Sequence, residues 1–184
     1  MAAAFGYVPF QTLVPVVLLG LVAAVAVATP ALLRHDPRAA LLRVTRVLLV
    51  GALLAILAVT LSGGGGTGVN LIPGAGIRAE LDNANRDLGL LNLAGNVLMF
   101  VPVGFLIPLA TRSGFRRALA ACVVISVAVE LFQLTLARSF DVDDVFLNAF
   151  GGALGAAVAV AGAILWRRAR VAAPETLLGE GPQG

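Results

Sequence analysis

The chain has 184 residues, of which 59% are hydrophobic and 12% are charged, and its formal net charge is +3. Soluble domains average about 45–50% apolar and about 25% charged residues, so this composition excludes an ordinary soluble domain and indicates an integral membrane protein. The basic residues are all arginines in short clusters between apolar runs. Such clusters are a topology signal, and we predict no nucleic-acid partner.

The first apolar run, at about Val8–Leu33, is long enough to span a bilayer, because about 20 residues at 1.5 Å each cover some 30 Å. No basic residue precedes it, so we expect a retained helix rather than a cleaved signal peptide. Arg34, Arg38, Arg43 and Arg46 follow the run. Arginines gather on the cytoplasmic side of a membrane, so this helix is predicted to begin outside the cell and end inside it.

The second apolar run, at about Leu41–Leu61, returns outward and ends at the glycines Gly63–Gly66, which predict a flexible tether. The loop that follows, to about Gly89, has few basic residues, as expected on the outer side. Its segment Val69–Ile77, VNLIPGAGI, is more apolar than a solvated loop requires. We therefore expect this segment to enter the membrane interface or to pack over the helix ends.

Three further apolar runs complete the predicted bundle. The third, at about Leu90–Thr111, contains Pro102 and Pro108. Prolines predict a kinked helix inside the bundle, because neighbours must satisfy the carbonyls that proline leaves free. The fourth run, about Ala118–Ala137, leads outward and the fifth, about Val145–Trp166, leads back. Arginines follow the third and fifth runs, which places those ends in the cytoplasm.

The runs together predict an all-α membrane protein. It is a bundle of about five transmembrane helices, with the N-terminus outside and the C-terminus in the cytoplasm. We divide it into an N-terminal transmembrane helix with a cytoplasmic loop (residues 1–40), a membrane domain (residues 41–166) and a cytoplasmic tail (residues 167–184). The tail is polar near its end and rich in Pro and Gly, so it is predicted to be disordered.

Polar side chains lie within or directly before the third, fourth and fifth runs in pairs, three or four residues apart, so each pair lies on one side of its helix. The pairs are Asn92 with Asn96, Glu130 with Gln133, and Asp144 with Asn148. A charge at the centre of a membrane helix costs about 2.5–3.5 kcal/mol, so Glu130 needs a partner or a task. With Arg138 and Asp141 in the connecting loop, these eight residues predict one polar pocket in the outer leaflet.

The sequence does not decide whether these polar residues only hold the helices together or also bind or react with a ligand. Asn and Gln often serve only to join membrane helices, whereas ionisable groups in the membrane are by default functional. Asp141, Asp143 and Asp144 with Glu130 offer oxygen ligands to Mg²⁺ or Ca²⁺, but they lack the full spacing of a calcium loop. We therefore predict neither a metal site nor a cofactor.

Small residues on the fifth run predict close helix packing. Gly151 and Gly155 form a G-x-x-x-G pattern, and Asn148 precedes them at a spacing that continues the same face. Such a face lets the backbone of a neighbouring helix approach closely.

Several short motifs between about Val47 and Leu165 resemble those of the VanZ-like family of bacterial membrane proteins. They are N-x-x-x-N-x-x-x-F-x-P-x-G-F (Asn92, Asn96, Phe100, Pro102, Gly104, Phe105), E-x-x-Q (Glu130, Gln133), R-x-x-D-x-x-D (Arg138, Asp141, Asp144), N-x-x-G-G-x-x-G (Asn148, Gly151, Gly152, Gly155) and VNLIP (Val69–Pro73). The resemblance implies a helical protein of the bacterial cytoplasmic membrane, related to a factor that gives low-level teicoplanin resistance. It implies no catalytic residues.

Two functions are compatible with these observations. In the first, a non-enzymatic membrane factor binds membrane lipids, a lipid-linked cell-wall precursor or a glycopeptide antibiotic in its outer pocket, with Arg138 facing phosphate or carboxylate. In the second, an intramembrane enzyme modifies a lipid-linked envelope substrate with Glu130 as acid or base. The sequence favours the first and leaves the ligand and the oligomeric state open.

Overall fold

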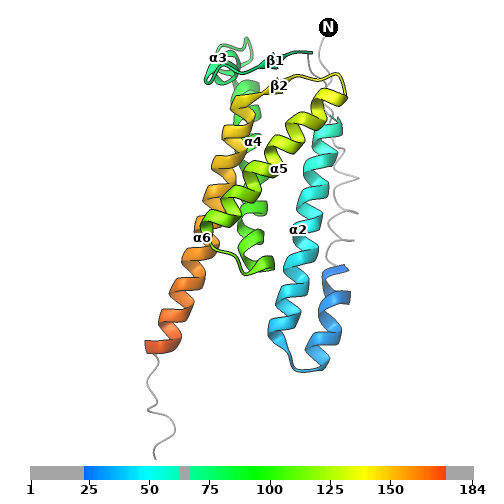
Figure 1. Cartoon of the computed structure of the whole chain (residues 1–184), viewed down its shortest axis with the longest axis vertical. Helices are drawn as coiled ribbons and strands as arrows, with labels where there is room; N and C mark the ends of the chain where they lie inside the picture. Colours follow the sequence, from blue (N-terminus) through cyan, green and yellow to red (C-terminus); the bar gives the residue numbers. More distant parts are fainter. Residues whose placement is uncertain (1–22, 63–66, 173–184) are drawn as a thin grey trace, which may run out of the picture.

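The structure is a computed structural model that describes residues 23–62 and 67–172 (Figure 1). Its elements in chain order are a short helix Ala23–Leu33, α2 (Pro37–Ser62), β1 (Val69–Asn70), α3 (Ala75–Leu81), α4 (Arg86–Thr111), α5 (Phe115–Thr135), β2 (Phe140–Asp141) and α6 (Val142–Ala172). The described chain is thus almost entirely helical, and the predicted all-α class is confirmed.

Within the described residues, α2, α4, α5 and α6 are the four helices long and apolar enough to cross a membrane. They match the second to fifth predicted runs. Of the first predicted run, the helix Ala23–Leu33 is described, while residues 8–22 lie outside the described residues. The predicted glycine tether Gly63–Gly66 also lies outside them.

Two of the long helices begin four residues earlier than the hydropathy predicted, and side chains at their N-termini explain why. Asp36 accepts a hydrogen bond from the Ala39 amide at 3.0 Å, and Pro37 is the first helical residue of α2. Asn85 likewise accepts from the Leu88 amide at 3.3 Å before α4. Asp and Asn caps and a first-turn proline are helix-starting signals that do not depend on hydropathy.

The C-terminal helix is longer than predicted. Helix α6 continues through the arginines after Trp166 and ends at Ala172. The prediction that disorder begins at residue 167 is therefore wrong for residues 167–172, and residues 173–184 lie outside the described residues. Arg170 stacks over the Trp166 ring, with its guanidinium carbon 4.8 Å from the ring centroid, and this contact stabilises the last turns of the helix.

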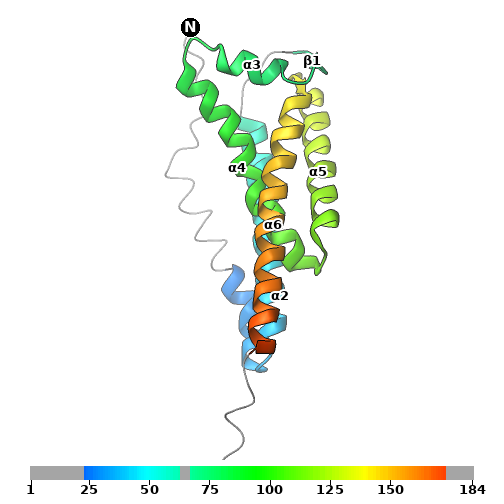
Figure 2. The ribbon, with the colours of Figure 1, turned by 90° about the vertical axis from the view of Figure 1, so that its left-hand side faces the viewer.

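Helix α4 lies at the centre of the bundle and contacts α2, α3, α5 and α6 (Figures 1 and 2). Its closest partner is α6, because glycines bring the two backbones into contact. A Cβ added to Gly104 would meet the Gly152 carbonyl, and one added to Gly151 or Gly155 would meet the carbonyl of Val97 or Val101. The predicted close-packing face of Gly151 and Gly155 is confirmed.

Apolar side chains cover the outside of the bundle. Leu91 on α4, Val124 on α5 and Val158 on α6 are each more than 60% exposed, and many other large apolar side chains are exposed as well. In water so large an apolar surface is unfavourable, whereas lipid tails solvate it well. The bundle is therefore the membrane-embedded part of a membrane protein.

The arginine clusters predict the orientation of the bundle in the membrane, and cysteine labelling tests it. Ser113 and Ser139 lie at opposite ends of α5, and Cys122, the single cysteine, is buried between them. In a Cys122→Ala background, we expect an impermeant thiol reagent to label Ser139→Cys and not Ser113→Cys in intact cells. Labelling of position 113 alone would invert the topology.

Candidate functional site

Strands β1 and β2 and helix α3 cover the end of the bundle where the polar pairs lie. Strands β1 and β2 pair in parallel, with Asn70 opposite Asp141, and helix α3 lies across the ends of α4 and α6 (Figures 1 and 2). The expectation that the apolar segment VNLIPGAGI packs over the helix ends is confirmed. The segment was expected to be part of a loop, but its last residues form the first turn of helix α3 (Ala75–Leu81).

Asp143 attaches α3 to α6. Its carboxylate accepts hydrogen bonds from the backbone amides of Gly74 at 2.7 Å, Gly76 at 2.8 Å and Ile77 at 3.1 Å. The first amides of a helix have no partner within the helix, and they carry partial positive charge, so a carboxylate satisfies them well. Gly74 has φ 85°, a left-handed conformation that glycine adopts without strain. Asp143 is 2% exposed, and its carboxylate serves to hold α3 against α6.

Glu130 and Asp141 form the next layer of the network. A carboxylate oxygen of Glu130, which is 2% exposed, accepts a hydrogen bond from the Asp141 amide at 3.0 Å. The Asp141 side chain accepts from the Asn70 amide group at 3.1 Å and from the Asp143 backbone amide at 2.9 Å. In the amide orientation that satisfies both groups, Gln133 donates to Glu130 at 3.2 Å. Glu130 therefore holds the chain at the end of β2, directly before α6 begins.

The two asparagines of α4 each donate to an acid on another element. Asn96 donates to Asp144 on α6 at 2.5 Å, and Asn92 donates to Glu80 on α3 at 3.2 Å. These contacts bring α3, α4 and α6 together at one level. Asn96 therefore faces α6, and Asn92, one turn earlier on α4, faces α3.

Asn148 takes part in a different contact. It is 2% exposed, and it donates a hydrogen bond to the Ser126 hydroxyl on α5 at 2.9 Å. Gly152, one turn further on, also faces α5, where an added Cβ would meet Cys122. The predicted single face of Asn148 with Gly151 and Gly155 is therefore wrong, since Asn148 faces α5 and the two glycines face α4.

The Arg138 side chain contacts α2 rather than forming a hydrogen bond with an acid among the described residues. Its guanidinium donates a hydrogen bond to the Thr60 carbonyl near the end of that helix. Helix C-termini leave carbonyls without intrahelical partners and carry partial negative charge, so an arginine is favourable there. No direct ion pair joins Arg138 to Glu130 among the described residues, and their hydrogen bonds go to different partners, the Thr60 carbonyl and the Asp141 amide.

A cavity of about 370 Å³ remains beneath α3, and we call it the α3 pocket. It is lined by Gly76, Ile77, Ala79, Glu80, Asn83, Leu93, Ser139, Asp141, Asp143 and Asp144. Its charged lining residues are all acids from α3, β2 and α6. The Oε2 atom of Glu80 is buried and has no hydrogen-bond partner among the described residues. Within the same residues, no cluster of His, Cys, Asp or Glu has the arrangement of a metal site.

The structure thus divides the eight predicted site residues into two groups. Asp141 and Asp144 line the α3 pocket, and Asn92 and Asn96 contact acids at its edge. Glu130, Gln133, Arg138 and Asn148 are absent from the residues that line it. Sequence reasoning missed Glu80, because it lay in a segment expected to be a loop. The apolar residues around it were the available signal that this segment folds onto the bundle.

No curated protein and no solved structure matches the chain. The family model described as VanZ/LLP1 matches residues 46–166, which is more than half of the chain and includes α4, α5 and the polar network. The match agrees with the motif resemblance and with the helical bundle. The chain belongs to the VanZ/LLP1 family.

Proposed function

We propose that this protein is a non-enzymatic membrane factor whose α3 pocket binds the hydroxyl- and amine-bearing head group of a lipid-linked cell-envelope component. The observation that carries this proposal is the buried Oε2 atom of Glu80, which faces no donor among the described residues. A buried acceptor without a hydrogen bond costs about 1–3 kcal/mol. A ligand that donates a hydrogen bond to this atom removes that cost and gains affinity.

The charge of the α3 pocket supports the same class of ligand. Glu80, Asp141, Asp143 and Asp144 line it, and no arginine does. Carboxylates accept hydrogen bonds and attract cations, so they favour sugar hydroxyls, amide N–H groups and ammonium groups. Arg138 donates to the Thr60 carbonyl, so its guanidinium is not assigned to the ligand.

The location of the pocket agrees with this role. The arginine pattern predicts that the α3 end faces the outside of a bacterial cytoplasmic membrane, where lipid-linked envelope components are exposed. A lipoglycopeptide antibiotic combines the same sugar hydroxyls with an acyl chain, and it meets the cell from the same side. Binding either molecule there gives low-level resistance of the teicoplanin type.

The geometry favours binding over catalysis by Glu130. A general acid or base must lie within hydrogen-bond reach of its substrate or reach it through one water. Glu130 is 2% exposed, accepts from the Asp141 amide and is not a lining residue of the α3 pocket. Turnover of a purified lipid-linked substrate would instead support the enzyme.

The sharpest test is Glu80→Gln. This change keeps the Oε1 acceptor for Asn92 and replaces only the unpartnered Oε2 with a donor. We expect the parent, purified in a mild detergent, to carry a sugar- or amine-bearing envelope lipid that mass spectrometry identifies. The variant should retain at least about tenfold less of it, because a hydrogen bond to a charged group contributes about 1.5–3 kcal/mol.

The matched control is Asp82→Asn, which removes an exposed acid at the end of α3 that does not line the pocket. It should retain the lipid like the parent. A parent that purifies without such a lipid, or equal retention by Glu80→Gln, would reject the binding role. In cells, Glu80→Gln should lower the teicoplanin concentration that stops growth, and an unchanged concentration would reject the resistance role alone.

A further inference from the structure

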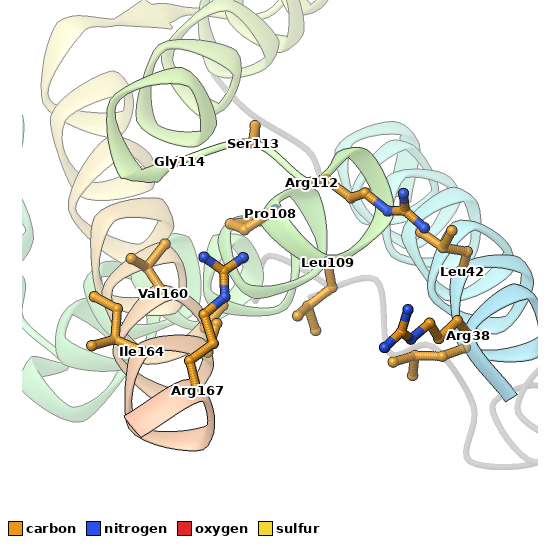
Figure 3. A pocket seen from close by; sticks show the side chains of 13 residues that line it. Arg38, Leu42, Pro108, Leu109, Arg112, Ser113, Gly114, Val160, Ile164 and Arg167 are labelled. Atoms are coloured by element: carbon orange, nitrogen blue, oxygen red, sulfur yellow. The ribbon is translucent and has the colours of Figure 1, made fainter. Parts of the chain in front are cut away.

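A second cavity, of about 680 Å³, lies at the opposite end of the bundle, between α2, α6 and the turn that joins α4 to α5 (Figure 3). We call it the arginine cavity. It is lined by Arg38, Leu41, Leu42, Pro108, Leu109, Arg112, Ser113, Gly114, Ala159, Val160, Ala163, Ile164 and Arg167. None of these residues belongs to the polar network beneath α3.

Unequal helix lengths create this cavity. Helix α4 ends at Thr111 and α5 starts at Phe115, while α2 and α6 continue past the turn between them (Figure 1). Arg112 makes the turn in the left-handed conformation, with φ 57°. A wedge therefore opens below Pro108 and Leu109, with α2 on one side and α6 on the other.

The charge at the cavity comes from three arginines on three different elements. Arg38 and Arg112 lie on one side of Leu109, and Arg167 lies on the other (Figure 3). No Asp or Glu lines the cavity. Within residues 23–62 and 67–172 these three guanidinium groups have neither a hydrogen-bond partner nor an ion-pair partner.

Two neighbouring arginines provide a contrast. Arg43 donates to the Val27 carbonyl at 3.5 Å, and Arg46 donates to the Ala110 carbonyl at 3.4 Å. These two side chains hold helices together, and Arg46 satisfies a carbonyl at the end of α4. The three arginines of the cavity have no such contact, so their donors are available to a ligand.

We propose that the arginine cavity binds the phosphate head group of an anionic phospholipid. The guanidinium groups donate charge-assisted hydrogen bonds to the phosphate oxygens. Leu42, Leu109, Val160 and Ile164 supply an apolar wall for the upper part of the acyl chains. Basic pockets between transmembrane helices are a recurrent way to hold such head groups.

The apolar wall distinguishes a lipid from free phosphate. An inorganic phosphate ion gains nothing from leucine, valine and isoleucine side chains, whereas a phospholipid buries methylene groups against them and is stabilised by each one. Residues of α2, α4 and α6 line the cavity, and all three helices are long and apolar enough to cross a membrane, so a lipid of the surrounding bilayer is the ligand closest at hand.

The test is native mass spectrometry of the purified full chain with equal amounts of dioleoyl phosphatidylglycerol and dioleoyl phosphatidylcholine. We expect the parent to retain the anionic lipid preferentially. Arg112→Gly and Arg167→Gln should each lower that retention about fivefold, because one arginine near an anionic head group contributes about 1 kcal/mol. Arg112→Gly also relieves a left-handed backbone at that position, so it should fold at least as well as the parent.

The matched controls are Arg116→Gln and Arg168→Gln, which remove exposed arginines at the same end that do not line the cavity. They should leave retention unchanged. Equal losses in the controls, or equal retention of both lipids by the parent, would overturn the proposal in favour of general surface charge. Displacement of the lipid by inorganic phosphate at equal concentration would overturn it in favour of a free-phosphate site.

Discussion

Replacing Gly155 by leucine should destabilise the folded protein by about 3 kcal/mol, near the upper end of what overpacking usually costs. An added Cβ at this position meets the Val101 carbonyl and lies 2.7 Å from the Phe105 amide nitrogen, so α4 and α6 must separate to admit it. Backbone atoms inside a helix cannot move aside as a flexible side chain can. Thermal unfolding of the purified variant in detergent measures the effect.

Gly162→Leu is the matched control on the same helix. A Cβ at Gly162 has no heavy atom within 4 Å, so the added side chain extends into open space. This variant should melt like the parent. If Gly155→Leu also accumulates and melts like the parent, the contact between the α4 and α6 backbones is not present in the membrane.

Replacing Asp143 by alanine should release α3 from the bundle. The change removes the acceptor of three backbone hydrogen bonds at Gly74, Gly76 and Ile77. With each bond to a carboxylate contributing about 1.5–3 kcal/mol, a loss of about 3 kcal/mol is a conservative expectation for the local structure. Amide hydrogen exchange of the segment 72–81 should therefore accelerate roughly 100-fold.

Two comparisons make this result specific. Asp143→Asn keeps one acceptor oxygen and should accelerate the amide exchange of residues 72–81 less than Asp143→Ala does. Asp82→Asn, which changes an exposed side chain at the other end of α3, should leave this exchange unchanged. Exchange in α4 away from the contact with α3 should stay slow in every variant. Unchanged exchange of the three amides in Asp143→Ala would mean that other groups protect them.

Much of the bundle could be predicted from the sequence, because a bilayer imposes a simple length and polarity rule. Each of α2, α4, α5 and α6 appears as an apolar run of about the length that spans the membrane. The G-x-x-x-G pattern also identified a close contact correctly, since glycines one turn apart leave room for another backbone. The helix starts were placed too late, because hydropathy does not register the caps Asp36 and Asn85.

The candidate site was predictable only in its composition. The sequence identified the polar residues and the end of the bundle where they gather, because polar groups in lipid stand out from an apolar background. It did not identify their partners. Arg138 and Glu130 are close in the chain, yet one contacts the Thr60 carbonyl and the other the Asp141 amide. Partners of this kind depend on which helices are neighbours.

The amino-acid sequence alone is enough to identify a helical membrane protein of the VanZ/LLP1 family, with polar groups concentrated toward one end. The contacts of those groups are defined only by the folded bundle. Folding placed α3 over the bundle, turned Asp143 into a cap for α3 and left Glu80 with an unpartnered oxygen in the α3 pocket. It also gathered three arginines around one cavity. This difference arises because hydropathy and spacing are local along the chain, whereas a hydrogen bond or a cavity between helices depends on residues tens of positions apart.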